Sequence, residues 1–228
     1  MRITRSQLER IRRRHFGYRI NLLVELLLLV LLPAAVQLAW LLPVMLCALA
    51  IVMIVFISRY SSLRRTRPLI YTLGGLAVLI ELIWLAMLRW SPAQAPQLTV
   101  PHVIVWVLFL VMVVIRKVRS LVREPYVTVS VVLGAASGYL TVGIAGGTLL
   151  STLWLLHPSS FLASALPSHG EVPPALMSAS FGLLTAVGTQ VLNPADVSAQ
   201  VMANVITISG QMYVAILIAL ILSRVQQR

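Results

Sequence analysis

Six runs of apolar residues restrict this chain to a helical fold within a membrane. The runs lie near 21–40, 42–58, 69–88, 101–116, 126–150 and 200–223. A helix needs about 20 apolar residues to cross the roughly 30 Å hydrocarbon core of a bilayer, so each run reaches or approaches the length of one span. Charged residues make up only 11% of the chain, whereas a soluble domain has about 25%. We therefore expect an all-α integral membrane protein with six transmembrane helices.

The basic residues occupy every second connection between these runs. Arginine and lysine concentrate before the first run, between the second and third, and after the fourth and the sixth, whereas the alternate connections hold only Arg89. Such alternation is typical of chains whose basic connections face the cytoplasm, so we expect both termini there. It also argues against nucleic acid as the reason for the net charge of +12. A basic leader at 1–20 would lie against anionic lipid headgroups, or would recruit a partner protein.

The runs divide the chain into four parts. The basic leader at 1–20 is followed by a four-helix block at 21–116, a basic cytoplasmic linker at 117–125, and a last part at 126–228 with two spans and a long loop between them. Pro33 and Pro43 are expected to interrupt the first two runs. Within the long loop, 175–188 is apolar but too short to cross a membrane. This segment is either a re-entrant half-helix with an extended return, or an external loop packed across the bundle.

A short apolar stretch at 174–184 leads into Thr185-Ala186-Val187-Gly188-Thr189-Gln190, and the last run carries Gly210-Gln211. This order resembles the pore helix, selectivity filter and inner helix of the potassium-channel superfamily, in the six-span form of its bacterial members. The resemblance implies that 126–228 is a pore-like module, with a re-entrant pore helix and filter loop between the last two spans. It further implies a homotetramer around a central axis, monovalent cations as the permeant species, and a bacterial inner membrane as the location.

The filter-like sequence departs from the family pattern Thr-Val-Gly-Tyr-Gly at three positions. Ala186 lacks the hydroxyl of the first threonine, Thr189 replaces the tyrosine that braces the family filter, and Gln190 replaces the second glycine. A glutamine that adopted a positive φ there would be strained. Carbonyl coordination of a dehydrated ion is therefore expected to be altered. The chain is then either a cation pore with weak selectivity or a non-conducting accessory or assembly subunit of a larger membrane complex.

The last run also carries a stripe that is suited to lining a cavity. At about 100° per residue, six of its side chains fall on one narrow face. They are Asn204, Ile208, Gln211, Ala215, Ile218 and Leu222. This order predicts a wet cavity next to an apolar constriction, although Asn204 and Gln211 could instead form hydrogen bonds between helices. Gly210 is a candidate hinge or a site of close packing.

Two carboxylates, Glu25 and Glu81, lie inside predicted spans, where a charge is costly unless it is paired. Glu25 is expected near the inner face, within reach of the basic leader. Glu81, near mid-span, has either a functional role or a buried structural hydrogen bond. The run from Val100 to Ile115 contains no lysine or arginine, so strong voltage sensing is not expected. The histidines lack metal-ligand spacing and no Gly-rich phosphate loop is present, so we expect no enzymatic activity, cofactor or metal site.

Overall fold

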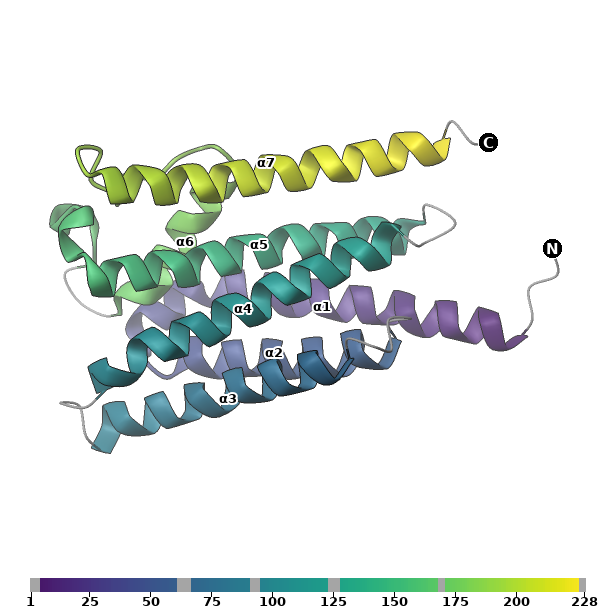
Figure 1. Cartoon of the computed structure of the whole chain (residues 1–228), viewed down its shortest axis with the longest axis horizontal. Coiled ribbons are helices and arrows are strands. Elements are labelled where there is room, and N and C mark those ends of the chain that lie inside the picture. The colour runs from purple at the N-terminus through teal and green to yellow at the C-terminus, as the bar shows by residue number, and fades with distance from the viewer. Residues whose placement is uncertain (1–4, 61–66, 91–94, 123–127, 168–170, 226–228) are drawn as a thin grey trace.

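The computed structural model describes residues 5–60, 67–90, 95–122, 128–167 and 171–225, and they form a bundle of helices (Figure 1). The parts of the predicted leader, linker and pore-like module at 1–4, 123–125 and 226–228 lie outside these residues. The elements are α1 (Arg5–Gln37), α2 (Leu41–Tyr60), α3 (Arg67–Trp90), α4 (Ala95–Val122), α5 (Val129–Leu156), η2 (Pro158–Ser160), η3 (Ala163–Ala165), α6 (Val172–Leu184) and α7 (Val197–Val225). The first residues of α1 and the last residues of α7 lie at one end of the bundle, and the α1–α2 connection and the end of α5 lie at the other (Figure 1).

The described part of the chain includes five helices that are long and apolar enough to cross a membrane. They cover His15–Gln37, Pro68–Met87, Val100–Val122, Val129–Leu156 and Val197–Leu220. Each contains or overlaps one of the predicted spans, because a continuous apolar run satisfies its backbone hydrogen bonds internally only as a helix. The predicted span at 42–58 lies in α2, whose described apolar part, Leu41–Val55, is shorter. An all-helical protein that is integral to the membrane is therefore supported.

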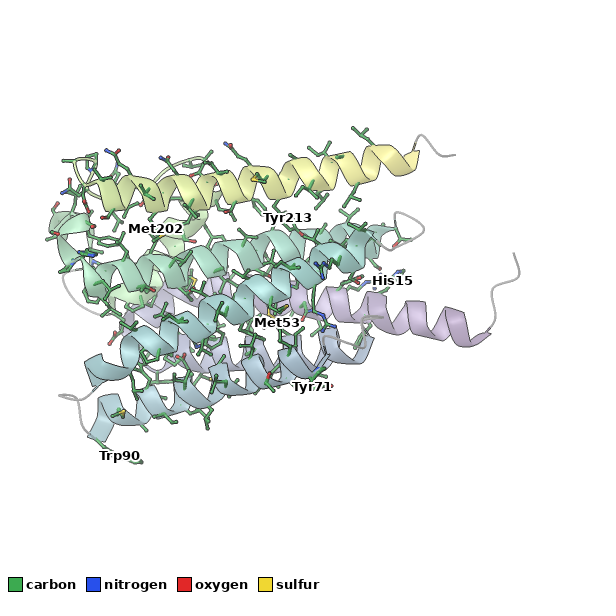
Figure 2. All side chains as sticks on the ribbon, viewed as in Figure 1. His15, Met53, Tyr71, Trp90, Met202 and Tyr213 are labelled. Atoms are coloured by element: carbon green, nitrogen blue, oxygen red, sulfur yellow. The ribbon has the colours of Figure 1, made fainter. Side chains whose placement is uncertain are left out.

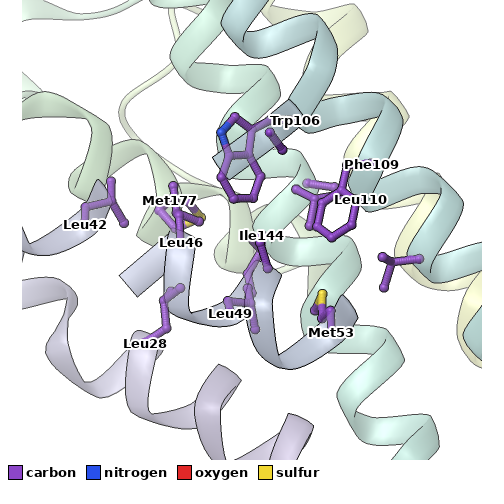
Figure 3. Close-up of a cluster of buried hydrophobic side chains, with 14 of the residues drawn as sticks. Leu28, Leu42, Leu46, Leu49, Met53, Trp106, Phe109, Leu110, Ile144 and Met177 are labelled. Atoms are coloured by element: carbon purple, nitrogen blue, oxygen red, sulfur yellow. The ribbon is translucent and has the colours of Figure 1, made fainter. Parts of the chain in front are cut away.

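Large apolar side chains from α1, α2 and α4 pack together in the core of the first four helices, α1–α4, which are called the front helices below (Figure 3). Trp106 and Phe109 of α4 meet edge to face, with ring centroids 6.0 Å apart. Ile144 of α5 and Met177 of α6 belong to the same cluster. The front helices and the C-terminal helices thus share one core rather than forming two separate bodies.

Helix α5 is central, because it contacts α1, α4, α6 and α7. Four of its glycines each face a large side chain, and a Cβ added there would lie too close to it. Gly134 faces Tyr18, Gly138 faces Tyr213, Gly143 faces Phe181 and Gly147 faces Met177. These contacts support the small-residue spacing of α5 as a packing device, since small residues let helices approach closely inside a membrane.

Three expectations about element boundaries require correction. Pro33 lies inside α1 without ending it, and α1 runs unbroken from the predicted leader through the first span. Pro43 lies in the first turn of α2, where a backbone N–H has no acceptor within the helix, so a proline causes no interruption there. Lys117, placed in the predicted cytoplasmic linker, continues α4 and is only 4% exposed.

Candidate functional site

The filter-like segment begins at the end of α6, a helix of 13 residues that lies against α1, α5 and α7. Pro173 and Pro174 stand in its first turn, where proline is favoured. Ser180 is fully buried and donates a hydrogen bond to the Gly143 carbonyl of α5. The short helix predicted at 174–184 is therefore present, beginning two residues earlier, and α5 fixes its orientation.

The end of α6 is closed by backbone hydrogen bonds from the first filter-like residues. The Ala186 N–H donates to the Leu183 carbonyl at 3.0 Å, and the Val187 N–H donates to the Gly182 carbonyl at 3.0 Å. Ala186 itself has a φ of +59°, which lies in the left-handed region. This pattern is a Schellman motif, in which glycine is the usual residue at the left-handed position. Ala186 therefore adopts a conformation that costs an L-residue roughly 1–2 kcal/mol.

The segment then folds back over α6. The Gly188 N–H also donates to the Gly182 carbonyl at 3.0 Å, and Gly188 has a φ of +88°. A Cβ on Gly182 would lie 2.5 Å from the Gly188 carbonyl oxygen, so only glycine fits at 182. Among the described residues, positive φ occurs at Ala186 and Gly188 rather than at Gln190. The backbone strain anticipated at Gln190 is located at Ala186 instead.

The filter-like segment lies largely on the surface of the single chain. Thr185, Ala186, Val187, Gly188 and Gln190 are exposed, and Val187 reaches 84% exposure. Thr189 is partly buried and accepts a hydrogen bond from the Val191 N–H at 3.2 Å.

The predicted cavity stripe lies on the uncovered face of α7. All six of its residues are exposed: Asn204, Ile208, Gln211, Ala215, Ile218 and Leu222. Side chains on this side of α7 project away from the bundle (Figure 2). Within the described residues neither Asn204 nor Gln211 forms a hydrogen bond to another helix of the chain, so the interhelical alternative is not realised inside one subunit.

The opposite face of α7 fixes it to α5 and α6. Tyr213 donates to the Ala135 carbonyl of α5 at 2.9 Å, and Thr207 donates to the Leu183 carbonyl of α6 at 3.0 Å. Gly210 is buried, and a Cβ there would lie 2.6 Å from the Leu184 carbonyl oxygen. This contact supports the packing alternative for Gly210 rather than the hinge.

The loops around α6 are fixed to each other. Phe161 and Leu192 form an antiparallel bridge, and the Asn193 N–H donates to the Ser160 carbonyl at 2.8 Å. The Ser160 hydroxyl donates to the Asp196 carboxylate, just before α7 begins. This hydrogen bond, helped by backbone N–H groups of the first turn of α7, holds the pKa of Asp196 below its ordinary value. The return path from the filter-like segment into α7 is thus anchored to the end of α5.

Glu25 forms a buried ion pair, but its partner is not in the basic leader as expected. Lys117 Nζ of α4 donates to Glu25 Oε1 at 2.7 Å, and the exposed fractions of the two side chains are 4% and 0%. The same ammonium donates to the Ser137 hydroxyl at 2.7 Å and to Thr141 Oγ1 at 2.8 Å. Three helices, α1, α4 and α5, are joined at this point.

Glu81 of α3 has two donors from α4. His102 Nε2 lies 2.5 Å from Glu81 Oε2, and Trp106 Nε1 donates to the same oxygen at 2.6 Å. His102, for which the sequence indicated no role, is thus a direct partner of Glu81. Within the described residues, no group of three or more His, Cys, Asp or Glu side chains is placed to hold a metal ion.

The resemblance to potassium channels rests on the sequence pattern alone. No family model, curated protein or solved structure matches the chain. The function therefore rests on the geometry around α6 and α7 and on the two amides that α7 leaves uncovered.

Proposed function

We propose that this chain is one subunit of a tetrameric cation pore with weak selectivity, built on the plan of the potassium channels. In this proposal, α5, α6 and α7 are the outer helix, the re-entrant pore helix and the inner helix. Residues 185–190 form the narrow part of the pore, and the stripe on α7 lines a cavity behind it. Monovalent cations are the permeant species.

The observation that carries the proposal is the exposure of two amides on a transmembrane helix. Asn204 and Gln211 lie in the apolar helix α7, on the face that no described part of the chain covers. An amide exposed to hydrocarbon without a hydrogen-bonding partner costs several kcal/mol, on the order of 4–8 by transfer to cyclohexane. A water-filled cavity removes this cost, and four copies of α7 around an axis would enclose one.

The exposed segment 185–190 adds a second line of support, because it follows directly on the end of α6, which packs against α7. The partial negative charge at the C-terminus of a helix favours a cation nearby. Ala186, Thr189 and Gln190 lack the features of a four-site potassium filter. A wider opening, with the ion partly hydrated, is consistent with these residues.

The proposal also assigns a topology. Helix α2 is taken as the sixth span, and α6 enters and leaves the bilayer from the same side. Because the termini lie at the end of the bundle where the basic residues concentrate, both are placed in the cytoplasm. The membrane would be the inner membrane of a bacterium, with anionic headgroups facing the leader.

One observation favours the second candidate, a non-conducting accessory or assembly subunit. The Gly182 carbonyl accepts N–H groups from both Val187 and Gly188, which folds the filter-like segment back on α6. A segment closed in this way does not need ions to hold its shape. In that case the exposed face of α7 would bind a larger membrane complex.

Cysteine accessibility in liposomes tests the proposal. Cys47 is first replaced by serine, since it is the one native cysteine. In that background, Gln211→Cys places a thiol on the stripe, and Ile216→Cys places one about 140° away on an exposed part of α7. A charged, water-soluble thiol reagent should react with the first variant and reduce cation flux. It should leave the second unreacted and its flux unchanged.

Sodium, potassium and a large organic cation are then compared as permeant ions. Flux that differs by less than about tenfold between sodium and potassium would agree with a relaxed filter. A tetramer without flux, at varied voltage, pH and calcium, would contradict the pore and favour the accessory subunit. Gly188→Asp serves as a further check, because a changed flux in that variant ties conduction to the filter-like segment.

A further inference from the structure

A cavity of about 790 Å³ lies between the front helices and the start of α6, at the end of the bundle opposite the termini. Its lining comes from five separate segments of the chain, and four of them supply the aromatic side chains and a buried carboxylate. The side chains are Trp40, Glu81, Trp84, His102, Trp106 and Trp154. Cavities of roughly 300–1,000 Å³ hold drug-sized ligands, so the space suits a substantial organic molecule.

A buried carboxylate stands in the wall of this cavity. Glu81 is 2% exposed, and both donors from α4 bind the same oxygen, Oε2. Among the described residues no donor is recorded for the other oxygen, Oε1. The carboxylate is therefore pre-oriented by two donors on one oxygen, and its other oxygen keeps its capacity for a ligand.

Aromatic faces surround this carboxylate. Trp84 stacks on His102, with ring centroids 5.1 Å apart and an angle of 3° between the planes. Trp84 Nε1 is buried without a partner among the described residues, which is unusual for an indole N–H. Tryptophan is the side chain whose face attracts a cation most strongly. Several indoles with one carboxylate form the surroundings that a large organic cation requires.

The remaining charge of the wall has the same sign. The described lining residues include a second carboxylate, Glu171, and no lysine or arginine. The rest of the lining is mainly apolar, including Leu42, Leu46 and Met177. We propose that this cavity binds an amphipathic organic cation, whose charge lies beside Glu81 and whose apolar groups lie among the indoles.

A cation bound here would contact the front helices and α6 together. The first turn of α6 forms part of the wall through Val172, Pro173 and Pro174. The Glu171 N–H at its start donates to the Val36 carbonyl of α1 at 2.8 Å. The site is separate from the uncovered face of α7, and binding does not depend on whether the chain conducts ions.

Equilibrium dialysis of the full-length protein in detergent micelles tests the site. Tetraphenylphosphonium is the probe, and tetraphenylborate, an anion of the same shape, is its matched control. Protein-free micelles give the background for each ion. Saturable binding of the cation should occur with one site per chain, whereas the anion should bind at least about tenfold more weakly, since one favourable charge contact corresponds to that ratio.

Three variants locate the site. Glu81→Gln removes the charge and keeps the shape, and should weaken cation binding about tenfold. Trp84→Leu removes one indole face and should weaken it roughly threefold to tenfold. Its matched control is Trp90→Leu on the same helix, because Trp90 is 80% exposed and extends away from the bundle (Figure 2).

The outcomes separate clearly. Equal binding of the cation and the anion, or cation binding unchanged by both Glu81→Gln and Trp84→Leu, would overturn the proposal. If Glu81→Gln does not fold, the comparison of Trp84→Leu with Trp90→Leu still decides. If the protein shows no cation flux but binds tetraphenylphosphonium as expected, the proposed function is refuted and this site is not.

Discussion

At the scale of single residues, Ala186 is the position where the chain departs most from local preference. It adopts a left-handed conformation at the C-terminus of α6, where a Schellman motif favours glycine. The departure is local, since Gly182 and Gly188 on either side provide the close approach and the second positive φ. Backbone strain of this kind often marks a functional segment.

We predict that Ala186→Gly stabilises the protein. Relief of the left-handed strain should raise the free energy of unfolding by about 1 kcal/mol, which corresponds to an increase in Tm of roughly 2–4 °C for a chain of this size. Thermal unfolding in detergent measures the change. Ala175→Gly is the control, because the same substitution within α6 should lower stability by about 1 kcal/mol. Destabilisation by both substitutions would contradict the argument.

At the scale of elements, the ion pair of Glu25 and Lys117 joins α1 to α4 and, through Ser137 and Thr141, to α5. A buried pair adds little net stability compared with apolar residues, but loss of one partner leaves an uncompensated charge. The pair therefore fixes how these three helices fit together more than it increases stability.

Substitution of one partner should accordingly cost more than substitution of both. We predict that Glu25→Gln lowers the free energy of unfolding by about 3–5 kcal/mol, and that adding Lys117→Met recovers most of the loss. Thermal unfolding of the two single variants and the double variant measures this coupling. A double variant as unstable as the sum of the single variants would show that the two side chains act independently.

The elements could be predicted well from sequence, and their contacts less well. Hydropathy located each long helix, because a lipid-facing run must be helical. It did not give all of the ends, since α1 begins well before the predicted run and α4 extends beyond its run at both ends. It could not place Lys117, because the charge of this residue suggested a surface linker. Its partner Glu25 lies 92 positions away in the sequence, so no local pattern connects the two. A signal for the Glu81 site did exist: His102 and Trp106 are one turn apart in α4, and Glu81 lies at a similar distance before the α3–α4 connection. The cavity itself requires side chains from five segments, which no local pattern reveals.

At the scale of the whole molecule, the chain leaves one side of α7 and the filter-like segment uncovered (Figure 1). Large apolar side chains on α7, including Val205, Met212 and Ile216, are suited to lipid or to a second copy. The two amides of the stripe are suited to neither lipid nor tight apolar packing. This combination is what a helix at the centre of a ring of subunits requires.

We therefore predict that the intact protein is a tetramer. Native mass spectrometry after release from detergent should give a mass four times that of the 25.0 kDa chain. Dilution should not dissociate it readily, because the amides would have to enter detergent without partners. A homogeneous monomer that retains its thermal transition would contradict this assembly.

Four glycines of α5, at positions 134, 138, 143 and 147, each pack against a large side chain, and these contacts limit how such an assembly could open and close. Tyr18, Tyr213, Phe181 and Met177 each rest against one of them, and they come from α1, α7 and α6. A rotation of α5 about its axis would drive its backbone into all four side chains at once. Helix α5 is therefore expected to keep its position within the subunit while other elements move. In the proposed pore, an opening motion would have to leave α5 in place, and Thr207, Gly210 and Tyr213 would keep this part of α7 packed against α5 and α6.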